Sequence, residues 1–307
     1  MFTSVWTPLG GKVADRWAGL LTSPVMVLWG GGLLAWVHGH GGLTGTGSGW
    51  KELERQWRTA FPEPAAQVAL LVGALLVVLA SARLLENLTL PVVRLLEGYW
   101  PRWAWPISAA LTWMRGRRIE RAARRWRDLA LRRDELTARE RLRFSRLDAG
   151  RAAVPAVPDL RMPTALGDLL RATELRIRLR YGLDAVACWP RLWILLPEQA
   201  RADIGQARAR LDEMARLWAV GVALAGFTIL TWWALLAAAV VAAVAHRLLR
   251  SAAADYAIML QSCFDLHRRM LYEAVDLPWE TRAEPEGGQR ITAFLTRGTA
   301  LTVAGEG

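Results

Sequence analysis

The sequence RGRRIERAARRWRDLALRRDELTARERLRFSR, from Arg115 to Arg146, decides how the rest of the chain is interpreted. It contains thirteen arginines, five acidic residues and no lysine. Its apolar residues recur at helical spacing, in steps of three, four and seven. They are Ile119, Ala122, Trp126, Leu129 and Leu136. This period predicts one long amphipathic helix with a basic surface.

The acidic residues of this stretch are placed to pair with arginines one turn away. We expect Glu120 to pair with Arg124, and Asp128 with Arg132. The remaining charge is available to anionic phospholipid or to a soluble protein partner, since an arginine near anionic lipid contributes about 1 kcal/mol. The candidates for this contact are Arg115, Arg117, Arg118, Arg121 and Arg125.

The composition separates two explanations of the basic charge. The chain has 307 residues, 53% of them hydrophobic, and a net charge of +11. Such charge is typical of nucleic-acid binding or of the cytoplasmic loops of membrane proteins. Long apolar segments favour the second, and no arrangement of base-reading or stacking residues is present. We therefore predict a membrane protein that binds no specific nucleic acid.

Chemistry-bearing motifs are absent from the sequence. Cys188 and Cys263 are far apart, with no CxxC and no Cys/His cluster, which favours two reduced structural thiols. His267 lies on a predicted amphipathic helix and is interpreted as a packed or solvated residue. Without an HExxH or GxSxG motif we predict no catalytic residue, no metal site, no cofactor and no enzymatic activity.

The N-terminal part predicts a first membrane hairpin. Residues 1–21 suit a short helix at the membrane surface, or alternatively a mobile tail. Ser23 and Pro24 begin a first span that reaches about Val37. Within it, Gly30, Gly31 and Gly32 are candidates for close helix packing, with a hinge as the alternative. Residues 50–61 form an amphipathic segment at the outer interface, and residues 65–85 form the second span.

The segment after the second span is rich in tryptophan. We expect residues 99–114 to lie along the membrane surface as an aromatic belt that leads into the arginine helix. A third span over residues 88–114 is the alternative; Pro91 and the charge of Arg94 argue against it. Prolines then make residues 155–163 an extended linker.

Two further helices follow the linker. Thr164 caps a helix that ends at Gly182. Residues 183–197 are apolar but too short to span, which indicates a buried or interfacial segment. An amphipathic helix starting after Pro197 runs into residues 217–249, which we interpret as a hairpin of two short spans, with one tilted span as the alternative. Arginines at both ends of this block favour the hairpin.

The C-terminal part is expected to be cytoplasmic. Residues 251–277 predict a helix that Pro278 ends. Residues 290–303 alternate enough to predict a small β-hairpin around Arg297 and Gly298, or else a disordered tail.

Together these patterns predict an all-α integral membrane protein. Two transmembrane helical hairpins, four spans in all, flank a basic helical cytoplasmic domain. The expected location is the bacterial inner (cytoplasmic) membrane, with both termini cytoplasmic. The predicted segments are residues 1–86 with the first hairpin, 87–216 with the basic domain, 217–250 with the second hairpin, and 251–307 with the C-terminal helix and tail.

Four blocks of sequence occur together in a recognisable order. They are LTLPVVRLLEGYWPRW at 88–103, RMPTALGDLLRATE at 161–174, RYGLDAVACWPRLWILLP at 180–197, and the helix from Tyr256 through FDLHR at 264–268 with LPW at 277–279. Over about residues 20–297 the chain resembles a family of arginine-rich membrane proteins of high-GC, actinobacteria-like bacteria. The resemblance implies the span layout and an inner-membrane location, and it carries no catalytic residues.

Three classes of function fit the pattern to different degrees. The first is a non-enzymatic membrane protein that forms a homo-oligomer, anchors a soluble cytoplasmic partner, or does both. The second is a pore or channel gated by a cytoplasmic signal, which the near absence of ionisable residues inside the spans disfavours. The third, a lipid-active enzyme, lacks a motif.

Overall fold

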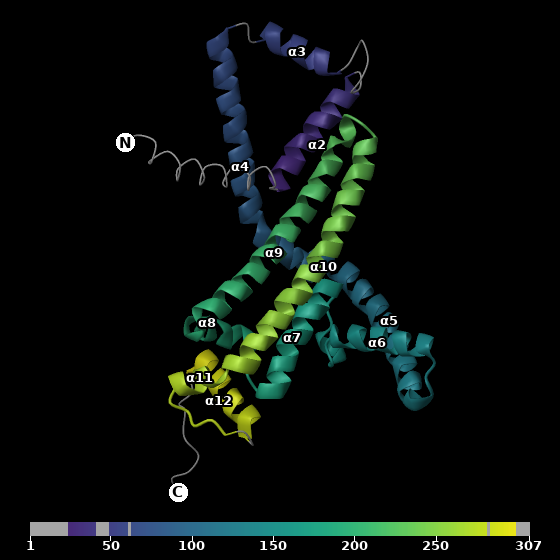
Figure 1. The fold of residues 1–307 in the computed structure, drawn as a ribbon, viewed down its shortest axis with the longest axis vertical. Coiled ribbons are helices and arrows are strands. Elements are labelled where there is room, and N and C mark those ends of the chain that lie inside the picture. The colour runs from purple at the N-terminus through teal and green to yellow at the C-terminus, as the bar shows by residue number, and fades with distance from the viewer. Residues whose placement is uncertain (1–23, 41–48, 61–62, 281–282, 299–307) are drawn as a thin grey trace. The chain divides into compact units, whose positions relative to one another are not determined.

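The structure, a computed structural model, describes residues 24–40, 49–60, 63–280 and 283–298 (Figure 1). Every regular element in these ranges is a helix, which confirms the all-α prediction. The surface helix predicted within residues 1–21 lies outside the described ranges. The chain forms two compact units. Unit 1 takes Met1–Val92 and Asp212–Leu249, and unit 2 takes Val93–Leu211 and Arg250–Gly307.

Unit 1 contains the apolar helices. The predicted amphipathic segment 50–61 is helical over its described residues, 50–60. Residues 87–92 and 212–216, predicted as part of the basic segment, belong to this unit. Its elements are α2 (Pro24–Gly39), α3 (Gly49–Ala60), the first part of α4 (Pro64–Glu97), the end of α9 (Glu198–Leu224), the 3-10 helix η4 (Ala225–Ile229) and the start of α10 (Trp233–His267).

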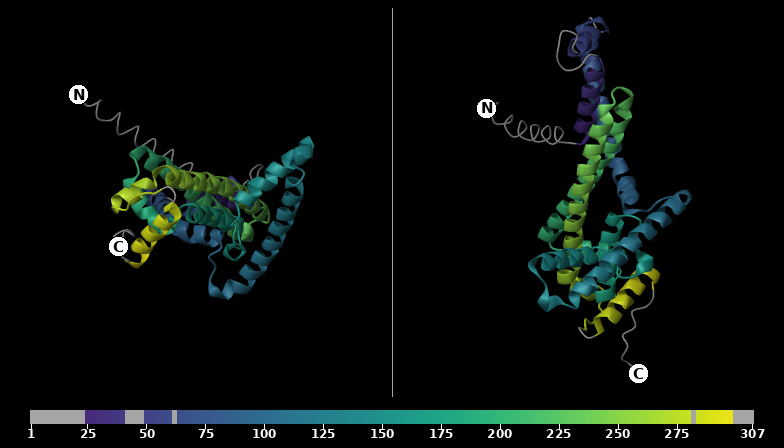
Figure 2. Two further views of the ribbon diagram at one scale, coloured as in Figure 1. Left: turned by 90° about the horizontal axis from the view of Figure 1, so that it is seen from below. Right: turned by 90° about the vertical axis from the view of Figure 1, so that its right-hand side faces the viewer.

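Between α9 and α10 the chain reverses direction. η4 tightens the end of α9, and the Leu230 N–H donates to the carbonyl of Phe227 at 2.9 Å. The two helices then lie side by side (Figures 1 and 2). A Cβ placed on Gly221 would lie only 2.7 Å from the backbone nitrogen of Ala242. The structure therefore has a helical hairpin here and not one continuous helix. Of the described residues in this block, Trp233–His267 is the stretch long and apolar enough to cross a membrane.

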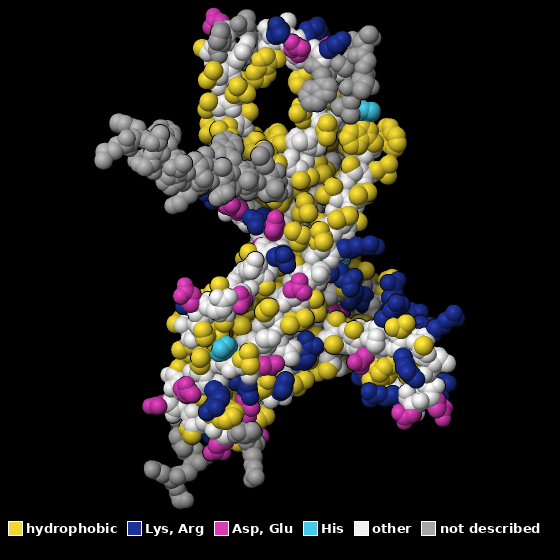
Figure 3. Space-filling view, viewed as in Figure 1, with side chains coloured by type: hydrophobic (Ala, Val, Ile, Leu, Met, Phe, Trp, Pro, Cys, Tyr) yellow, Lys and Arg dark blue, Asp and Glu magenta, His cyan; other side chains and the backbone are white. Residues whose placement is uncertain are grey.

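One buried cluster of unit 1 is made by Val220, Leu224 and Ala238, against which Leu28 and Leu85 pack. Further residues of this unit, such as Val37 and Ala245, are also buried. Most other apolar side chains of these helices are exposed, and Figure 3 shows hydrophobic side chains covering the surfaces of α2, α4 and the paired parts of α9 and α10. This is the reverse of the distribution that a helix bundle needs in water.

Two helical stretches are long and apolar enough to cross a membrane. One begins at Ala65 in α4, and none of its apolar window is buried; the other lies in Trp233–His267, and 22% of its window is buried. α2 is apolar but shorter, as is α8 (Ala185–Leu195) in unit 2. These findings concern only the residues that the structure describes.

α4 is longer than the predicted second span. It continues from residue 85 through Pro91 to Glu97, so the aromatic segment begins only after this helix ends. Gly98, with φ of +101°, terminates it. We cite Pro91 against a third span over residues 88–114; the helix passes through Pro91 but ends at Glu97.

The arginine-rich stretch is two helices rather than one. α5 (Trp105–Ala130) already includes part of the predicted surface segment, and after the short 3-10 helix η2 (Arg133–Glu135) the chain enters α6 (Ala138–Ala152). The break has a local cause. Thr137 caps α6 through its side chain, and the Glu140 side chain accepts in return from the Thr137 N–H at 2.9 Å. This capping box starts a new helix at a point where the spacing of apolar residues predicted that the first helix would continue.

The centre of unit 2 follows the predicted caps. Thr164 accepts from the Gly167 N–H at 3.0 Å to begin α7 (Ala165–Tyr181), and Gly182, with φ of +70°, ends it. Asp184 caps α8 in the same way. Cys188 and Leu192 of α8 are fully buried, which places the apolar segment 183–197 in the core.

The C-terminal part of unit 2 is also helical. α10 continues to His267 and is followed by α11 (Arg269–Ala274) and α12 (Glu284–Arg297). The predicted β-hairpin is wrong for the described residues up to Gly298, because residues 290–297 lie in α12. Pro285 and two acidic residues start this helix, and Gly298 in the left-handed conformation ends it.

Unit 2 has a larger core than unit 1. It is made by α7, α8 and the unit 2 parts of α9 and α10, together with α11 and α12. Its fifteen buried residues include Tyr181, Leu192, Phe264, Tyr272 and Ile291. α5 and α6 belong to the same unit as this core.

Candidate functional site

The arginines of α5 divide into two groups in the structure. Arg115 donates from Nη2 to Oδ2 of Asp168 at 2.5 Å, and Asp168 is only 1% exposed. The Met162 N–H donates to the other carboxylate oxygen at 2.7 Å. Arg115 is thus committed to a buried ion pair that fixes α5 to the first turn of α7. It is a structural residue of unit 2.

The other predicted arginines remain on the surface. Arg118, Arg121 and Arg125 are exposed, and Nε of Arg121 donates to the backbone carbonyl of Arg117. The guanidinium of Arg117 lies 4.0 Å from the ring centroid of Trp113. Such stacking holds an arginine in place without neutralising it. Figure 3 shows Lys and Arg side chains gathered over α5 and α6.

The predicted pairing of acids within the stretch is not found. Glu120 pairs instead with Arg161 of the linker, at 3.5 Å. The helix ends at Ala130, so Asp128 and Arg132 no longer share a helical turn. The charge of α5 is consequently less self-neutralised than the sequence predicted.

The N-terminal half of α5 carries an exposed aromatic surface. Trp103, just before the helix, is 80% exposed, and Trp105 is 70% exposed. Ile107 and Trp113 are also exposed. Tryptophan beside arginine is the composition of a membrane–water interface. α5 therefore changes from apolar and aromatic to basic along its length.

Side-chain stacking joins α5 to α6 near their connection. The rings of Trp126 and Phe144 stack with centroids 5.6 Å apart, and Arg151 lies 3.6 Å from the Trp126 centroid. Trp126 also donates from its indole nitrogen to Asp148 at 3.0 Å. The sequence placed Trp126 on an apolar face but gave no sign of α6 as its partner.

A groove runs along one face of α5. It has a volume of about 550 Å³ and is closed on its other side by Pro158 and Arg161 of the linker. Arg161 was missed by the sequence analysis, because its nearest acidic partner, Glu120, is far away in the chain. The α5 residues of the groove are Trp105, Ser108, Ala109, Thr112, Trp113, Gly116, Arg117 and Glu120.

The three glycines of α2 have different surroundings. A Cβ on Gly31 would lie 2.8 Å from Leu224, and one on Gly32 would lie 2.6 Å from Phe227. These two glycines allow α2 to approach the end of α9. Gly30 is exposed, and a Cβ there would meet nothing within 4 Å. Among the described residues, nothing covers this position.

Two smaller pockets of about 130 Å³ each lie elsewhere in unit 2. One contains Glu97 and Tyr99, and burial raises the pKa of both groups. Beside them Arg171 pairs with Glu174 at 3.0 Å. Neither a nucleophile with its base nor a convergent set of donors is formed there.

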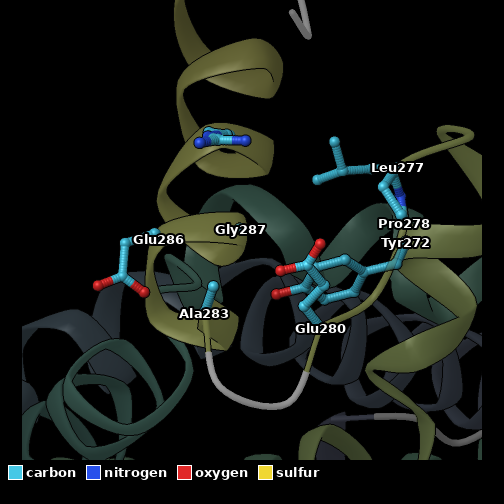
Figure 4. A pocket seen from close by; sticks show the side chains of 8 residues that line it. Tyr272, Leu277, Pro278, Glu280, Ala283, Glu286 and Gly287 are labelled. Carbon is cyan, nitrogen blue, oxygen red and sulfur yellow. The ribbon is translucent and has the colours of Figure 1, made fainter. Parts of the chain in front are cut away.

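The other small pocket lies at the start of α12 and is lined by Tyr272, Glu280 and Glu286 (Figure 4). Beside it, Arg268 and Trp279 both donate to the carboxylate of Glu284, which is 8% exposed. Burial raises the pKa of Tyr272 to about 12. These contacts fasten α12 to the core.

The two cysteines, Cys188 and Cys263, are also structural residues. Both cysteines are buried as free thiols, and burial raises the pKa of Cys188 to about 11. Burial also raises the pKa of Cys263. Within the described ranges no cluster of three or more His, Cys, Asp or Glu side chains could hold a metal ion.

The chain was compared with protein families, curated proteins and solved structures. No protein-family model, no curated protein and no solved structure matches the chain. The class of protein is therefore defined by its own geometry. It is an all-α protein with two helices long and apolar enough to cross a membrane and a separate unit that carries a basic, tryptophan-rich helix.

Proposed function

We propose that the chain is a four-span protein of the bacterial inner membrane that self-assembles and holds a soluble partner at the cytoplasmic face, without enzymatic activity. One observation carries this proposal: none of the apolar window of α4 is buried. Val68, Leu71 and Leu76 are each about 60% exposed. Exposed apolar area costs about 25 cal/mol per Å² in water, and a lipid environment removes that cost.

The four spans in this proposal are α2, the first part of α4, the end of α9 with η4, and the first part of α10. The α9–α10 reversal supports two crossings where a single helix would make one. The termini and unit 2 lie in the cytoplasm, because basic residues gather on that side of membrane proteins. The +11 net charge and the arginines of α5 supply this bias.

The pore alternative receives less support. In the proposed spans, the hydroxyls of Ser81 and Thr228 donate to carbonyls of their own helical turns, at 2.7 and 2.6 Å. An ion pathway usually shows polar or ionisable side chains inside the spans, and the proposed spans carry few of them. A lipid-active enzyme would need a reactive constellation in unit 2, and the pockets described above supply none.

Topology is tested by labelling introduced cysteines with a membrane-impermeant maleimide. The native thiols are buried and have raised pKa values, so they react slowly. Trp232→Cys lies in the α9–α10 turn and Leu131→Cys follows α5; these side chains are 74% and 86% exposed. We expect intact cells to label Trp232→Cys and to label Leu131→Cys only after lysis. Labelling of both from the same side would contradict the proposal.

Membrane integration has a separate test. Alkaline carbonate washing releases peripheral proteins and leaves spanning proteins in the pellet. We expect the full chain to stay with the membrane, and its release into the supernatant would overturn the four-span arrangement.

Self-assembly is tested at Gly30, which nothing among the described residues covers. Small residues allow helices of different subunits to approach closely. We expect Gly30→Leu to lower the mass of the detergent-solubilised assembly. Gly73→Leu on α4 is the matched control, since a Cβ there also meets nothing within 4 Å. A wild-type chain that is monomeric in mild detergent would refute self-assembly.

A further inference from the structure

The groove on α5 is amphipathic from one end to the other. Its α5 residues come from successive turns, so they share one face of the helix. Trp105 lies at one end, and Arg117 lies twelve residues further along, about 18 Å away at 1.5 Å per residue. The groove therefore offers an aromatic surface and a cationic surface within the length of one lipid molecule.

The cationic end has unused hydrogen-bonding capacity. The guanidinium of Arg161 has five N–H donors. Its side chain is 13% exposed, and its one ion pair, with Glu120, is long at 3.5 Å. Its Nε has no hydrogen-bond partner among the described residues but is itself buried, so a ligand would meet the terminal nitrogens of this guanidinium. Arg117 stacks on Trp113 and forms no ion pair with any described residue.

The charge of this end selects a singly charged anion. Two arginines and one glutamate give a net charge of +1, since +2 and −1 sum to +1. A phosphodiester carries one negative charge and presents oxygens that match guanidinium donors. The Glu120 carboxylate is 57% exposed. It can accept hydrogen bonds from headgroup hydroxyls, and it repels a headgroup that carries a carboxylate besides its phosphate.

We propose that this groove binds one anionic phospholipid through its phosphoglycerol headgroup. Arg117 and Arg161 bind the phosphate, Glu120 accepts from the glycerol hydroxyls, and Trp105, at the far end of the groove, contacts the distal part of an acyl chain. The inference rests on the proposed membrane location for its supply of lipid. It extends that proposal by assigning one specific lipid site, which involves Arg161 and excludes the arginines elsewhere on α5.

The test is native mass spectrometry of the full chain in a neutral detergent, titrated with phosphatidylglycerol and, in parallel, with phosphatidylcholine. We expect one phosphatidylglycerol to bind about tenfold more tightly than phosphatidylcholine. Both lipids carry the phosphodiester, but the choline cation offsets its charge beside the two arginines and offers no hydroxyl to Glu120. Equal binding of the two lipids would overturn the proposal.

Variants separate the groove from general basic charge. Arg117→Gln and Arg161→Gln each remove a phosphate ligand and should weaken phosphatidylglycerol binding about tenfold. Ala109→Leu fills the groove from an exposed position without changing charge, and should weaken binding similarly. Arg118→Gln is the matched control on the same helix and should change binding less than about twofold. An equal loss in Arg118→Gln, or no loss in Arg117→Gln and Ala109→Leu, would refute the site.

Competitors identify the source of the anion. Inorganic phosphate and a single-stranded oligonucleotide should each fail to displace the lipid at equal concentration. Displacement by phosphate would show a free-anion site, and displacement by the oligonucleotide would show a nucleic-acid surface; either result overturns the proposal. Because the titration is done in detergent, its outcome is independent of whether carbonate washing releases the chain from membranes.

Discussion

At the scale of single residues, unit 2 depends on a few buried charged contacts. Asp168 is the clearest, because its carboxylate is almost fully buried and receives Arg115 and the Met162 N–H. Sequence analysis placed Arg115 on a surface. It could not pair Arg115 with Asp168, because the two residues are 53 positions apart.

The Arg115–Asp168 pair predicts an asymmetric response to mutation. Arg115→Met leaves the Asp168 carboxylate buried and unpaired, and should lower the free energy of unfolding by about 3 kcal/mol. Asp168→Asn should cost less, because the Arg115 side chain is 28% exposed and can be hydrated. Urea unfolding of unit 2, followed by circular dichroism in detergent, measures both. A larger cost for Asp168→Asn would contradict this assignment.

Tyr181 predicts how stability depends on alkaline pH. Its hydroxyl donates to Asp265 at 2.5 Å, and burial, followed by that hydrogen bond, raises its pKa to about 12 from an ordinary value of 10.0. Between pH 10 and 12 the unfolded chain loses this proton while the folded chain keeps it. The stability contributed is therefore complete below pH 10 and is lost as pH rises toward 12.

Tyr181→Phe should reduce that alkaline loss. At pH 7 it should cost about 1–2 kcal/mol, since a hydrogen bond to a charged acceptor is removed. Unfolding midpoints measured from pH 9 to 12 should then fall less steeply in the variant than in the wild-type chain. Parallel pH curves would show that Tyr181 does not ionise on unfolding in this range.

At the scale of elements, the sequence predicted the helices whose caps are local. Thr164 and Gly182 bound α7 as expected. Residues 183–197 were predicted as buried or interfacial, and the structure places them in the core. Both predictions rest on residues that are close together in the sequence.

Other element boundaries required signals that periodicity does not contain. The apolar period continued from Trp126 to Leu136 and hid the capping box of Thr137 and Glu140, which was readable as Thr-x-x-Glu. Alternation suggested strands at 290–303, whereas Ile291 is fully buried on one face of α12. The groove and its Arg161 depend on the α5–linker packing, which no local pattern encodes.

The α9–α10 hairpin gives a matched glycine test. Gly221→Ala would put a Cβ 2.7 Å from backbone nitrogen and 2.9 Å from the Cα of Ala242, so the helices must separate. Overpacking of this kind costs about 1–3 kcal/mol. Gly226→Ala is the control, because its Cβ meets nothing within 4 Å. We expect a lower thermal midpoint in detergent for Gly221→Ala only; equal midpoints would refute close packing at Gly221.

At the scale of the whole molecule, the two units have opposite relations to solvent. Unit 2 buries a cluster of fifteen residues in one core, whereas none of the apolar window of α4 in unit 1 is buried and many apolar side chains of that unit are exposed. In water, only unit 2 has the division of apolar side chains between interior and surface that a folded domain needs. In a membrane the helices of unit 1 satisfy their backbone hydrogen bonds internally and need no large core.

This difference predicts two separate responses of the full chain to urea in detergent micelles. Unit 2 should unfold cooperatively, and the reaction of Cys188 and Cys263 with a maleimide should rise at the same urea concentration as part of the helical signal is lost. The micelle-embedded helices of unit 1 should keep their part of that signal, because hydrocarbon leaves backbone groups no water to bind. Arg115→Met should move the first transition and leave the residual helicity unchanged. Complete loss of helicity in one transition coincident with thiol exposure would show that unit 1 depends on unit 2 for its fold.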